Sequence, residues 1–188
     1  VSVSGCAYGG GGGTDAGIET RWTGATGIRL DTTLSRLLFA LRFRDLDLLI
    51  SDQVTAQSQL LMHRTLRERL GLIAPFLRYD KDPYVVVTGE GRLVYIQDAF
   101  TTSNRFPNAQ PFNPAELRAS GLAGMDLNYI RNSVKVVMDA YDGTMTFYMA
   151  DPTDPIVQAW AGVFPTLFHP LSDMPVDLRA HLRVPEDL

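Results

Sequence analysis

Two apolar segments on either side of Asp142-Gly143 constrain the fold more than any other stretch of the chain. This dipeptide favours a two-residue type I′ turn, in which both positions need a positive φ. Counting outward from such a turn places Tyr141 opposite Thr144. One face of the hairpin then carries the apolar side chains of Val134, Val136, Met138, Ala140, Met145, Phe147 and Met149. The other face carries Lys135, Asp139, Tyr141, Thr144 and Thr146, so we expect one buried and one solvated face.

A second hairpin is predicted over residues 84–97. The β-branched and aromatic run from Tyr84 to Thr88 is turned back by Gly89-Glu90-Gly91 and followed by the segment from Arg92 to Gln97. Its strands are apolar on both faces, which is typical of a strand buried on both sides. We therefore expect this hairpin to lie deeper than the first and centrally in the sheet.

A helix is predicted near residues 32–44, where leucines recur at positions i, i+3, i+4 and i+7. The stripe consists of Leu34, Leu37, Leu38 and Leu41. Asp31 can cap this helix, and the arginines fall mainly outside the stripe. We expect the stripe to face the core. The segment from Asp45 to Ile50 prolongs the helix or forms a short strand, and we prefer the helix.

Three further helices are predicted downstream. Thr65 and Glu68 have the spacing of a capping box, which predicts a helix over 66–74, before Pro75. Asp154-Pro155 provides an N-cap and a first-turn proline for a helix over 155–164, with Ile156, Trp160, Val163 and Phe164 on its apolar face. Trp160 is expected to be a core residue. The last helix is expected over 176–183, where Leu178 and Leu182 form an i, i+4 pair.

Two segments lack apolar periodicity. Residues 1–30 are rich in glycine and are predicted to be a flexible segment; Gly13-Thr14-Asp15 has an acid where a phosphate-binding loop needs lysine. Residues 98–127 hold several prolines and amides and are predicted to be a long connection with one short helix over 115–119. This connection is either a surface crossover, which we favour, or a binding loop.

These elements together predict an α+β fold, with a mostly antiparallel sheet built from two β-hairpins and covered by several short helices. The predicted domains are a Gly-rich flexible segment over 1–30 and a single α+β domain over 31–188.

Composition excludes some classes of function. The 188 residues carry a net charge of −4, and the 17 basic residues are spread along the chain, so nucleic acid is not an expected partner. No apolar run approaches the roughly 20 residues that span a bilayer, so this stretch is not expected to cross a membrane. Cys6 is the one cysteine, which excludes an intrachain disulfide.

No pattern of residues predicts a reaction. The serines lack a Gly-x-Ser-x-Gly environment, and His63, His169 and His181 lie far apart without zinc-ligand spacing. Asp45 and Asp47 have no further ligand nearby, and a solvated face is preferred for them over a metal site. The densest carboxylates, Asp139, Asp142, Asp151 and Asp154, are read as turn and cap residues rather than as a calcium loop. We therefore assign no catalytic, cofactor-binding or metal-binding residue, and no cofactor.

Several motifs carry a resemblance to a known family. They are Arg36-Leu37-Leu38-Phe39-Ala40, Arg67-Glu68-Arg69, Ala74-Pro75-Phe76-Leu77, Asp82-Pro83-Tyr84, Asp98-Ala99-Phe100-Thr101-Thr102, Tyr129 to Lys135, Asp139 to Thr144 and Leu182 to Leu188. In these motifs the chain resembles the bacterial integral-membrane proteins called uncharacterised protein family 0182, over most of residues 25–188. Val184 departs from the tyrosine that family members often have there.

The resemblance implies that the full protein lies in the cell membrane of a bacterium and has a bundle of transmembrane helices. It also implies a large extracytoplasmic portion, of which this chain is an internal piece. It implies no activity. We expect a non-catalytic interaction or assembly module, which contacts the rest of its own membrane-embedded chain or a second copy. The alternative is part of a cell-envelope enzyme whose site is completed outside this stretch. The expected contact surface is an apolar patch of Phe106, Phe112, Leu167, Phe168 and Leu171.

Overall fold

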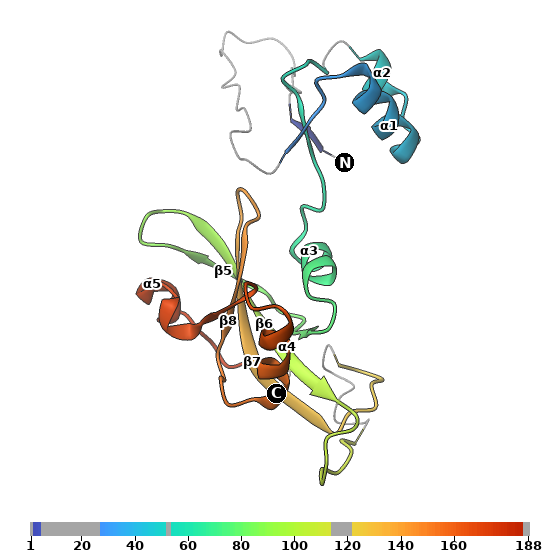
Figure 1. Cartoon of the computed structure of the whole chain (residues 1–188). Helices are drawn as coiled ribbons and strands as arrows, with labels where there is room; N and C mark the ends of the chain where they lie inside the picture. Colours follow the sequence, from blue (N-terminus) through green and yellow to red (C-terminus); the bar gives the residue numbers. More distant parts are fainter. Residues whose placement is uncertain (1, 5–26, 52–53, 114–121, 186–188) are drawn as a thin grey trace. The chain divides into compact units, whose positions relative to one another are not determined.

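The computed structural model describes residues 2–4, 27–51, 54–113 and 122–185 (Figure 1). The chain divides into two compact units, Val1–Arg64 (unit 1) and Thr65–Leu188 (unit 2). Helices and antiparallel-dominated sheets are both present, which confirms the predicted α+β class. The predicted glycine-rich segment lies largely outside the described residues, as does the short helix expected over 115–119.

Unit 1 combines a small sheet with two helices. The strands β1 (Ser2–Ser4), β3 (Gln59–Leu61) and β2 (Ile28–Arg29) form an antiparallel sheet in that order. Helix α1 (Thr33–Phe43) begins at Thr32, whose side chain and that of Ser35 form a capping box, so the cap is one residue later than the predicted Asp31. Helix α2 (Asp47–Ile50) is a separate short helix. The predicted helix over 32–44 is confirmed.

The leucine stripe of α1 does not face the core, contrary to the prediction. Its members are exposed, at 64% for Leu34, 42% for Leu37, 57% for Leu38 and 66% for Leu41. The helix instead presents Ala40, with Phe39 and Phe43 beside it, to a small core of Leu30, Leu48, Val54 and Leu60. Helix α1 is apolar on two sides, and the described residues of unit 1 cover only one of them.

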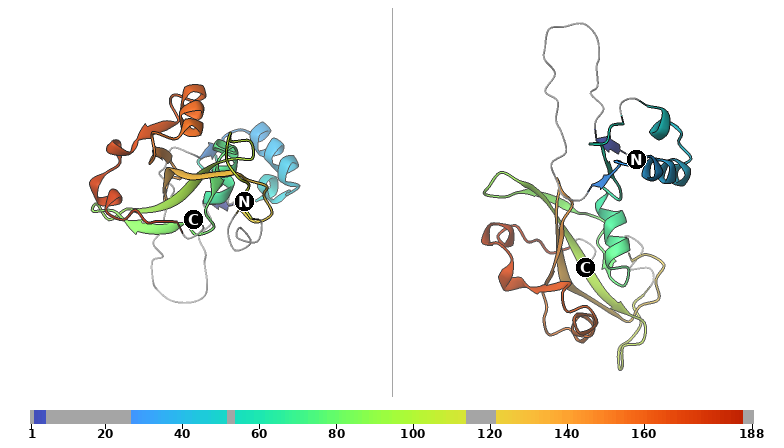
Figure 2. Two further views of the ribbon diagram at one scale, coloured as in Figure 1. Left: turned by 90° about the horizontal axis from the view of Figure 1, so that it is seen from below. Right: turned by 45° about the horizontal axis from the view of Figure 1, so that its top comes forward.

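Unit 2 is built on a six-stranded sheet with the order β4-β6-β7-β8-β9, and with β5 also paired to β6. Its strands are β4 (Arg78–Tyr79), β5 (Tyr84–Val87), β6 (Leu93–Ser103), β7 (Tyr129–Asp139), β8 (Met145–Met149) and β9 (Phe168–Pro170). The long strands β6 and β7 lie at the centre, as further views show (Figure 2). All pairings are antiparallel except that of β8 with β9. The predicted mostly antiparallel sheet is confirmed.

The β7–β8 hairpin has the predicted faces but a different turn. Met138 pairs with Met145 and Val136 with Phe147, and the backbone N–H of Asp139 donates to the carbonyl oxygen of Thr144 at 3.0 Å. The loop therefore holds residues 140–143 rather than two residues, with Gly143 at φ 72°. The register moves by two residues, which leaves each side chain on its predicted face because the strand period is two. Ala140 alone leaves its face and is exposed in the loop.

Both faces of the sheet are covered, which corrects the prediction of a solvated face. On one face Val134, Val136 and Phe147 pack with Leu70 and Val157. These partners belong to helices α3 (Leu66–Ile73) and α4 (Pro155–Val163). On the other face, the expected polar one, Val137 and Tyr148 are buried with Tyr84, Val86, Val94, Ile96, Met174 and Leu178. The C-terminal segment supplies this second layer, with the 3₁₀ turn η2 (Leu171–Asp173) and helix α5 (Val176–Arg179).

The β5–β6 hairpin confirms the predicted strands over 84–97 but not their burial on both faces. Strand β6 is central, as expected, whereas β5 pairs only with β6 within the described part of the chain. Tyr84 and Val86 are buried, while Val85 and Val87 are 50% and 62% exposed. The hairpin therefore extends past the helices that cover the rest of that face.

The predicted helices of unit 2 are present with altered contacts. Thr65 precedes α3 without a side-chain cap bond, so the expected capping box does not form. Asp154 caps α4 and Pro155 occupies its first turn, as predicted. Trp160 is half-buried rather than a full core residue, and its ring stacks on that of Phe76 with 4.0 Å between the ring centroids.

Two further outcomes concern the apolar face of α4 and the last helix. Val163 is 62% exposed, whereas Val157, outside the predicted stripe, is fully buried. The last helix covers only Val176–Arg179 of the predicted 176–183.

Candidate functional site

A buried ion pair lies between the two central strands of unit 2. Asp98 on β6 and Lys135 on β7 are register partners and are 3% and 6% exposed. The Lys135 ammonium donates to Asp98 Oδ1 and to the carbonyl oxygen of Arg183 at 3.0 Å. Asn132 Nδ2 donates to the same Asp98 oxygen at 3.0 Å. The lysine placed on a solvated face by sequence is thus buried beside a carboxylate, which offsets the cost of removing its charge from water.

The C-terminal segment closes over this ion pair. Besides the carbonyl that accepts from Lys135, Arg183 donates its backbone N–H to Tyr84 Oη at 3.3 Å. Its guanidinium carbon lies 4.5 Å from the centroid of the Tyr84 ring, in cation–π geometry. Burial raises the pKa of Tyr84, which keeps this hydroxyl neutral. Residues far apart in sequence therefore meet in one polar cluster, the Asp98 cluster, which consists of Asp98, Lys135, Asn132, Tyr84 and Arg183.

A second buried carboxylate, Asp154, joins α4 to the sheet. It is fully buried, and Oδ1 accepts from the backbone N–H of Ile156 at 2.9 Å and from Tyr129 Oη at 2.8 Å. Its Oδ2 accepts from Ser133 Oγ at 2.5 Å and from Thr101 Oγ1. Burial by itself raises the pKa of Asp154, but the hydrogen bonds from Ser133, Thr101, Ile156 and Tyr129 outweigh it and hold the pKa below its ordinary value.

The chemistry of both groups suits structural roles. Both oxygens of Asp154 already accept two hydrogen bonds each, so the carboxylate has little capacity left for taking a proton from a substrate. Tyr129 is held neutral, because burial and the Asp154 carboxylate raise its pKa to about 12. In the described residues, Asn132 Oδ1 is the buried side-chain polar atom without a hydrogen-bond partner. This oxygen belongs to the Asp98 cluster, in which the Nδ2 group of the same side chain donates to Asp98.

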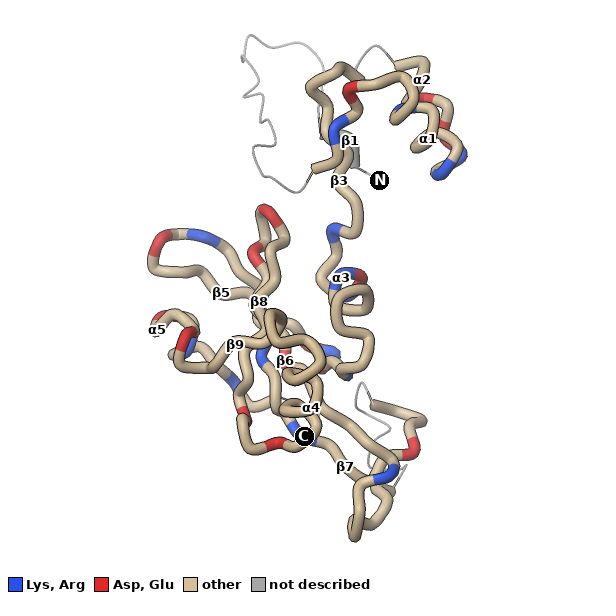
Figure 3. Tube along the Cα trace, in the orientation of Figure 1, with Lys and Arg blue, Asp and Glu red and all other residues tan. Residues whose placement is uncertain are grey.

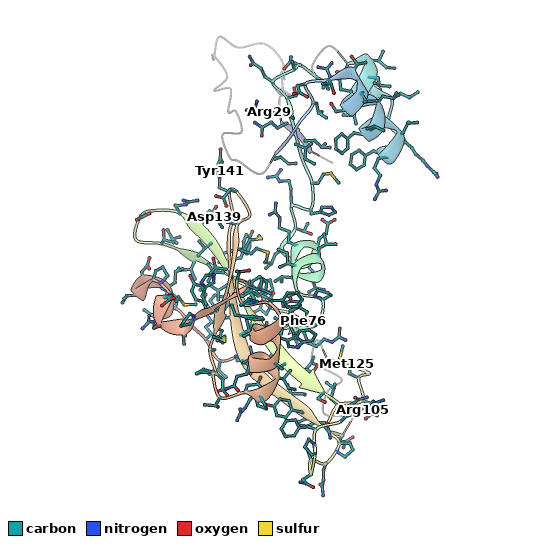
Figure 4. All side chains as sticks on the ribbon, viewed as in Figure 1. Arg29, Phe76, Arg105, Met125, Asp139 and Tyr141 are labelled. Carbon is teal, nitrogen blue, oxygen red and sulfur yellow. The ribbon has the colours of Figure 1, made fainter. Side chains whose placement is uncertain are left out.

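The four carboxylates noted in the sequence separate into two places. Asp139 and Asp142 lie at the β7–β8 loop, where Asp139 pairs with Arg92 at 2.6 Å (Figure 4). Hydrogen bonds from the Thr144 side chain and backbone N–H lower the pKa of Asp142, which is the predicted turn role. Asp151 and Asp154 precede α4, and Asp151 pairs with Arg131 at 3.2 Å. No three His, Cys, Asp or Glu side chains in the described ranges lie close enough to hold a metal ion.

Two of the histidines and the early aspartates have local contacts of their own. His169 lies beside Tyr148 at 6.3 Å between ring centroids, and His181 Nδ1 lies 2.7 Å from the carbonyl oxygen of Asp177. Asp45 accepts from the backbone N–H of Asp47 at 3.0 Å, and both side chains are exposed, as the preferred interpretation held.

The expected apolar patch is largely covered. Phe168 is 6% exposed and packs against Phe147, whereas Phe106, Leu167 and Leu171 are half-buried. Phe112 is 38% exposed and is the one member of the five that fits the prediction. Sequence reasoning placed the patch in proline-rich segments because they lack apolar periodicity, but those side chains find partners within unit 2.

Exposed apolar side chains also lie on and beside the two helices of unit 1. Together with the leucine stripe of α1, Leu46 is 65%, Leu49 is 36% and Ile50 is 72% exposed. We call the surface formed by Leu34, Leu37, Leu38, Leu41, Leu46, Leu49 and Ile50 the α1–α2 face. The signal was present in the sequence as an amphipathic stripe, but its pattern is the same whether the stripe meets a core or a partner.

No helix in the described ranges is both long and apolar enough to span a membrane. No solved structure matches this chain.

The relatives found by comparison with known proteins carry the same family name. The chain is 47% identical over 176 residues to a UPF0182 protein of Moorella thermoacetica, a match that covers 94% of this chain and 18% of the relative. It is 48% identical over 167 residues to one of Clostridium acetobutylicum, covering 89% and 17% respectively. The chain therefore spans less than a fifth of the length of these curated relatives. The family model for Uncharacterised protein family (UPF0182) matches residues 10–188, and the chain belongs to this family.

Proposed function

We propose that this chain is a non-catalytic interaction or assembly module in the extracytoplasmic part of a multi-spanning bacterial membrane protein. The α1–α2 face is the observation that carries the proposal. Large exposed apolar surfaces on soluble domains mark sites of contact with other proteins, membranes or ligands, and we take the first of these here. Here four of the exposed side chains share one side of α1 through their helical spacing, and three more lie on or just before α2, the next helix along the chain.

The proposed occupant of the α1–α2 face is the rest of the longer family chain. In the relatives from Moorella thermoacetica and Clostridium acetobutylicum the matched region makes up only 18% and 17% of the protein. Several times as much chain is thus available to cover this face. Burying each leucine in such a contact contributes about 1.5–3 kcal/mol at full burial.

The polar groups of unit 2 support a scaffold role. Asp154 has its donors within the unit, and the Asp98 cluster ties the C-terminal segment to the sheet. A catalytic carboxylate or lysine needs a free position toward a substrate. These groups use their hydrogen-bonding capacity on each other.

The test is cysteine labelling in this chain and in a longer family chain that carries it, both with Cys6→Ser. Leu38→Cys reports on the α1–α2 face, and Val176→Cys, at a side chain that is 78% exposed in unit 2, is the matched control. We expect a maleimide to label both positions in the 188-residue chain. In the longer chain, labelling of Leu38→Cys relative to Val176→Cys is expected to fall at least tenfold. Equal relative labelling in the two chains contradicts docking of this face.

The proposed location has its own measurement. A maleimide that does not cross membranes is applied to intact cells that produce the longer chain with Val176→Cys, and to the same cells after detergent lysis. An extracytoplasmic unit 2 is expected to label equally in both. Labelling that appears only after lysis contradicts the extracytoplasmic location.

A further inference from the structure

Strand β5 has one open edge. It pairs with β6 through Tyr84–Ile96, Val85–Tyr95, Val86–Val94 and Val87–Leu93. The backbone N–H of Thr88 donates to the carbonyl oxygen of Arg92 at 2.8 Å, which makes this pair a hydrogen-bonded one. Since hydrogen-bonded and non-bonded pairs alternate in antiparallel strands, the backbone groups of Val85 and Val87 point away from β6. Among the described residues no other strand pairs with β5.

The side chains along this edge are apolar and exposed on one face. Val85, Val87 and Leu93 are 50%, 62% and 50% exposed, and they share a face because Val87 is the register partner of Leu93. Charged residues flank the strand and do not interrupt it: Lys81 and Asp82 precede it, and Glu90 and Arg92 lie at the turn (Figure 3). Proteins usually block an open edge with a charge, a proline or a bulge within the strand. Tyr84–Val87 has none of these.

The chemistry of this edge selects its occupant. Outward N–H and C=O groups at the spacing of a strand are matched by another extended strand, not by a helix or a side chain. The exposed valines require that this strand be apolar on the same face. The opposite end of the sheet is a poor candidate, because β9 has only three residues and ends in Pro170, which lacks an N–H.

We propose that β5 pairs antiparallel with β5 of a second copy of this chain, about a twofold axis at Val86. This register places Val85 opposite Val87 of the second copy, so that each outward N–H meets a carbonyl oxygen. It also brings Val85, Val87 and Leu93 of both copies together on one face. The interface is isologous, as in most homodimers, and Pro83 ends the ladder beyond Tyr84. The inference concerns unit 2 alone and does not rest on the α1–α2 face.

The first test measures the mass of the 188-residue chain by sedimentation equilibrium over a range of concentrations. The weight-average mass is expected to rise toward twice the monomer mass. Val85→Lys places a charge at the edge and is expected to return the mass to that of a monomer. Val163→Lys, at a valine of helix α4 that is 62% exposed, is the matched control and is expected to dimerise like the unsubstituted chain.

Leu38→Lys separates this inference from the proposed function. A dimer held by β5 persists when the α1–α2 face carries a lysine. A chain that stays monomeric at all concentrations overturns the inference. A dimer that is lost with Leu38→Lys and kept with Val85→Lys overturns it as well, and assigns self-association to the α1–α2 face instead.

Cross-linking tests the register. In the Cys6→Ser background, an equal mixture of Val85→Cys and Val87→Cys chains is expected to form several times more disulfide-linked dimer than either variant alone, because only the mixture places the two cysteines opposite each other. Each variant is first checked for the unfolding midpoint of the parent chain. Equal cross-linking in the mixture and in the single variants contradicts the register about Val86.

Discussion

Lys135 and Asp98 are opposite each other on strands β7 and β6, and the Lys135 ammonium also holds the carbonyl oxygen of Arg183. One buried side chain thus joins the centre of the sheet to the C-terminal segment that covers it. Burying two charges is costly, and the pair gains back that cost only while both partners and their hydrogen bonds are present. The energetic consequence is asymmetric: losing one member is much worse than losing both.

This asymmetry gives a stability prediction. Lys135→Met leaves the Asp98 carboxylate buried without its cation and is expected to lower the free energy of unfolding by about 3–5 kcal/mol. Urea denaturation followed by circular dichroism measures the change. The double variant Asp98→Leu with Lys135→Met is expected to recover most of the loss. Arg92→Ala, which breaks a pair whose arginine is 53% exposed, is the control and is expected to cost at most about 1 kcal/mol.

Removal of the Asp154 carboxylate should be costly for a different reason. Asp154→Ala takes away the cap of α4 and the acceptor that the Ser133 and Thr101 hydroxyl groups share, although Thr101 Oγ1 keeps the carbonyl oxygen of Arg131 at 3.4 Å. A lost N-cap costs about 1 kcal/mol and a stranded buried polar group about 1–3 kcal/mol, so we expect a total near 2–4 kcal/mol in urea denaturation. Asp151→Ala, at an exposed turn, is expected to cost less than about 1 kcal/mol. Similar losses in the two variants contradict the role given to Asp154.

The lowered pKa of Asp154 also predicts a pH dependence. A carboxyl whose folded pKa lies below its unfolded pKa contributes stability above the unfolded value, about 3.9, and loses it as the pH falls through the folded value. Stability measured from pH 6 down to pH 2 should therefore decline below about pH 4. Asp154→Asn cannot ionise and is expected to show a shallower decline. An unchanged slope shows that the acid sensitivity arises from other carboxylates.

The structure lowers the stability cost that we expect for replacing Trp160 by alanine. A full core tryptophan predicts a cost of about 3–5 kcal/mol for replacement by alanine. Trp160 is half-buried and forms one aromatic cluster with Phe76 and Phe164, whose ring centroids lie 4.0 Å and 6.1 Å from its own. We expect Trp160→Ala to cost about 2–3 kcal/mol, from partial burial and the aromatic contacts. Phe164→Ala, at a side chain 41% exposed, should cost less in the same denaturation assay.

The sequence predicted what depends on local period and capping. The predicted faces of β7 and β8 are correct although the turn between them differs from the predicted one, because a shift of register by two residues keeps every side chain on its face. Asp154 with Pro155 fixed the start of α4. The Asp98–Lys135 ion pair was not predicted. Predicting it requires knowing that β6 and β7 are neighbours in the sheet, although a long connection separates them in the sequence. The exposure of the leucine stripe of α1 was not predicted either, because the sequence of a helix shows which side is apolar and not what covers that side.

The β7–β8 loop provides a last prediction, at Gly143. Its φ of 72° is in the left-handed region, and a Cβ built there lies 2.5 Å from the guanidinium carbon of Arg69. Arg69 Nη1 donates to the Gly143 carbonyl oxygen at 2.7 Å, so that α3 holds the loop. Gly143→Ala is expected to lower stability by about 1–2 kcal/mol from the backbone alone and to displace Arg69.

Gly91→Ala is the matched control for this prediction, because Gly91 also has a positive φ, 78°, but no atom within 4 Å of an added Cβ. The difference between the two variants in urea denaturation isolates the contact with Arg69. In the background of Arg69→Ala the guanidinium is gone, and Gly143→Ala is then expected to cost no more than Gly91→Ala. A Gly143→Ala cost that is unchanged by Arg69→Ala shows that the loop is set by its own backbone and not by α3.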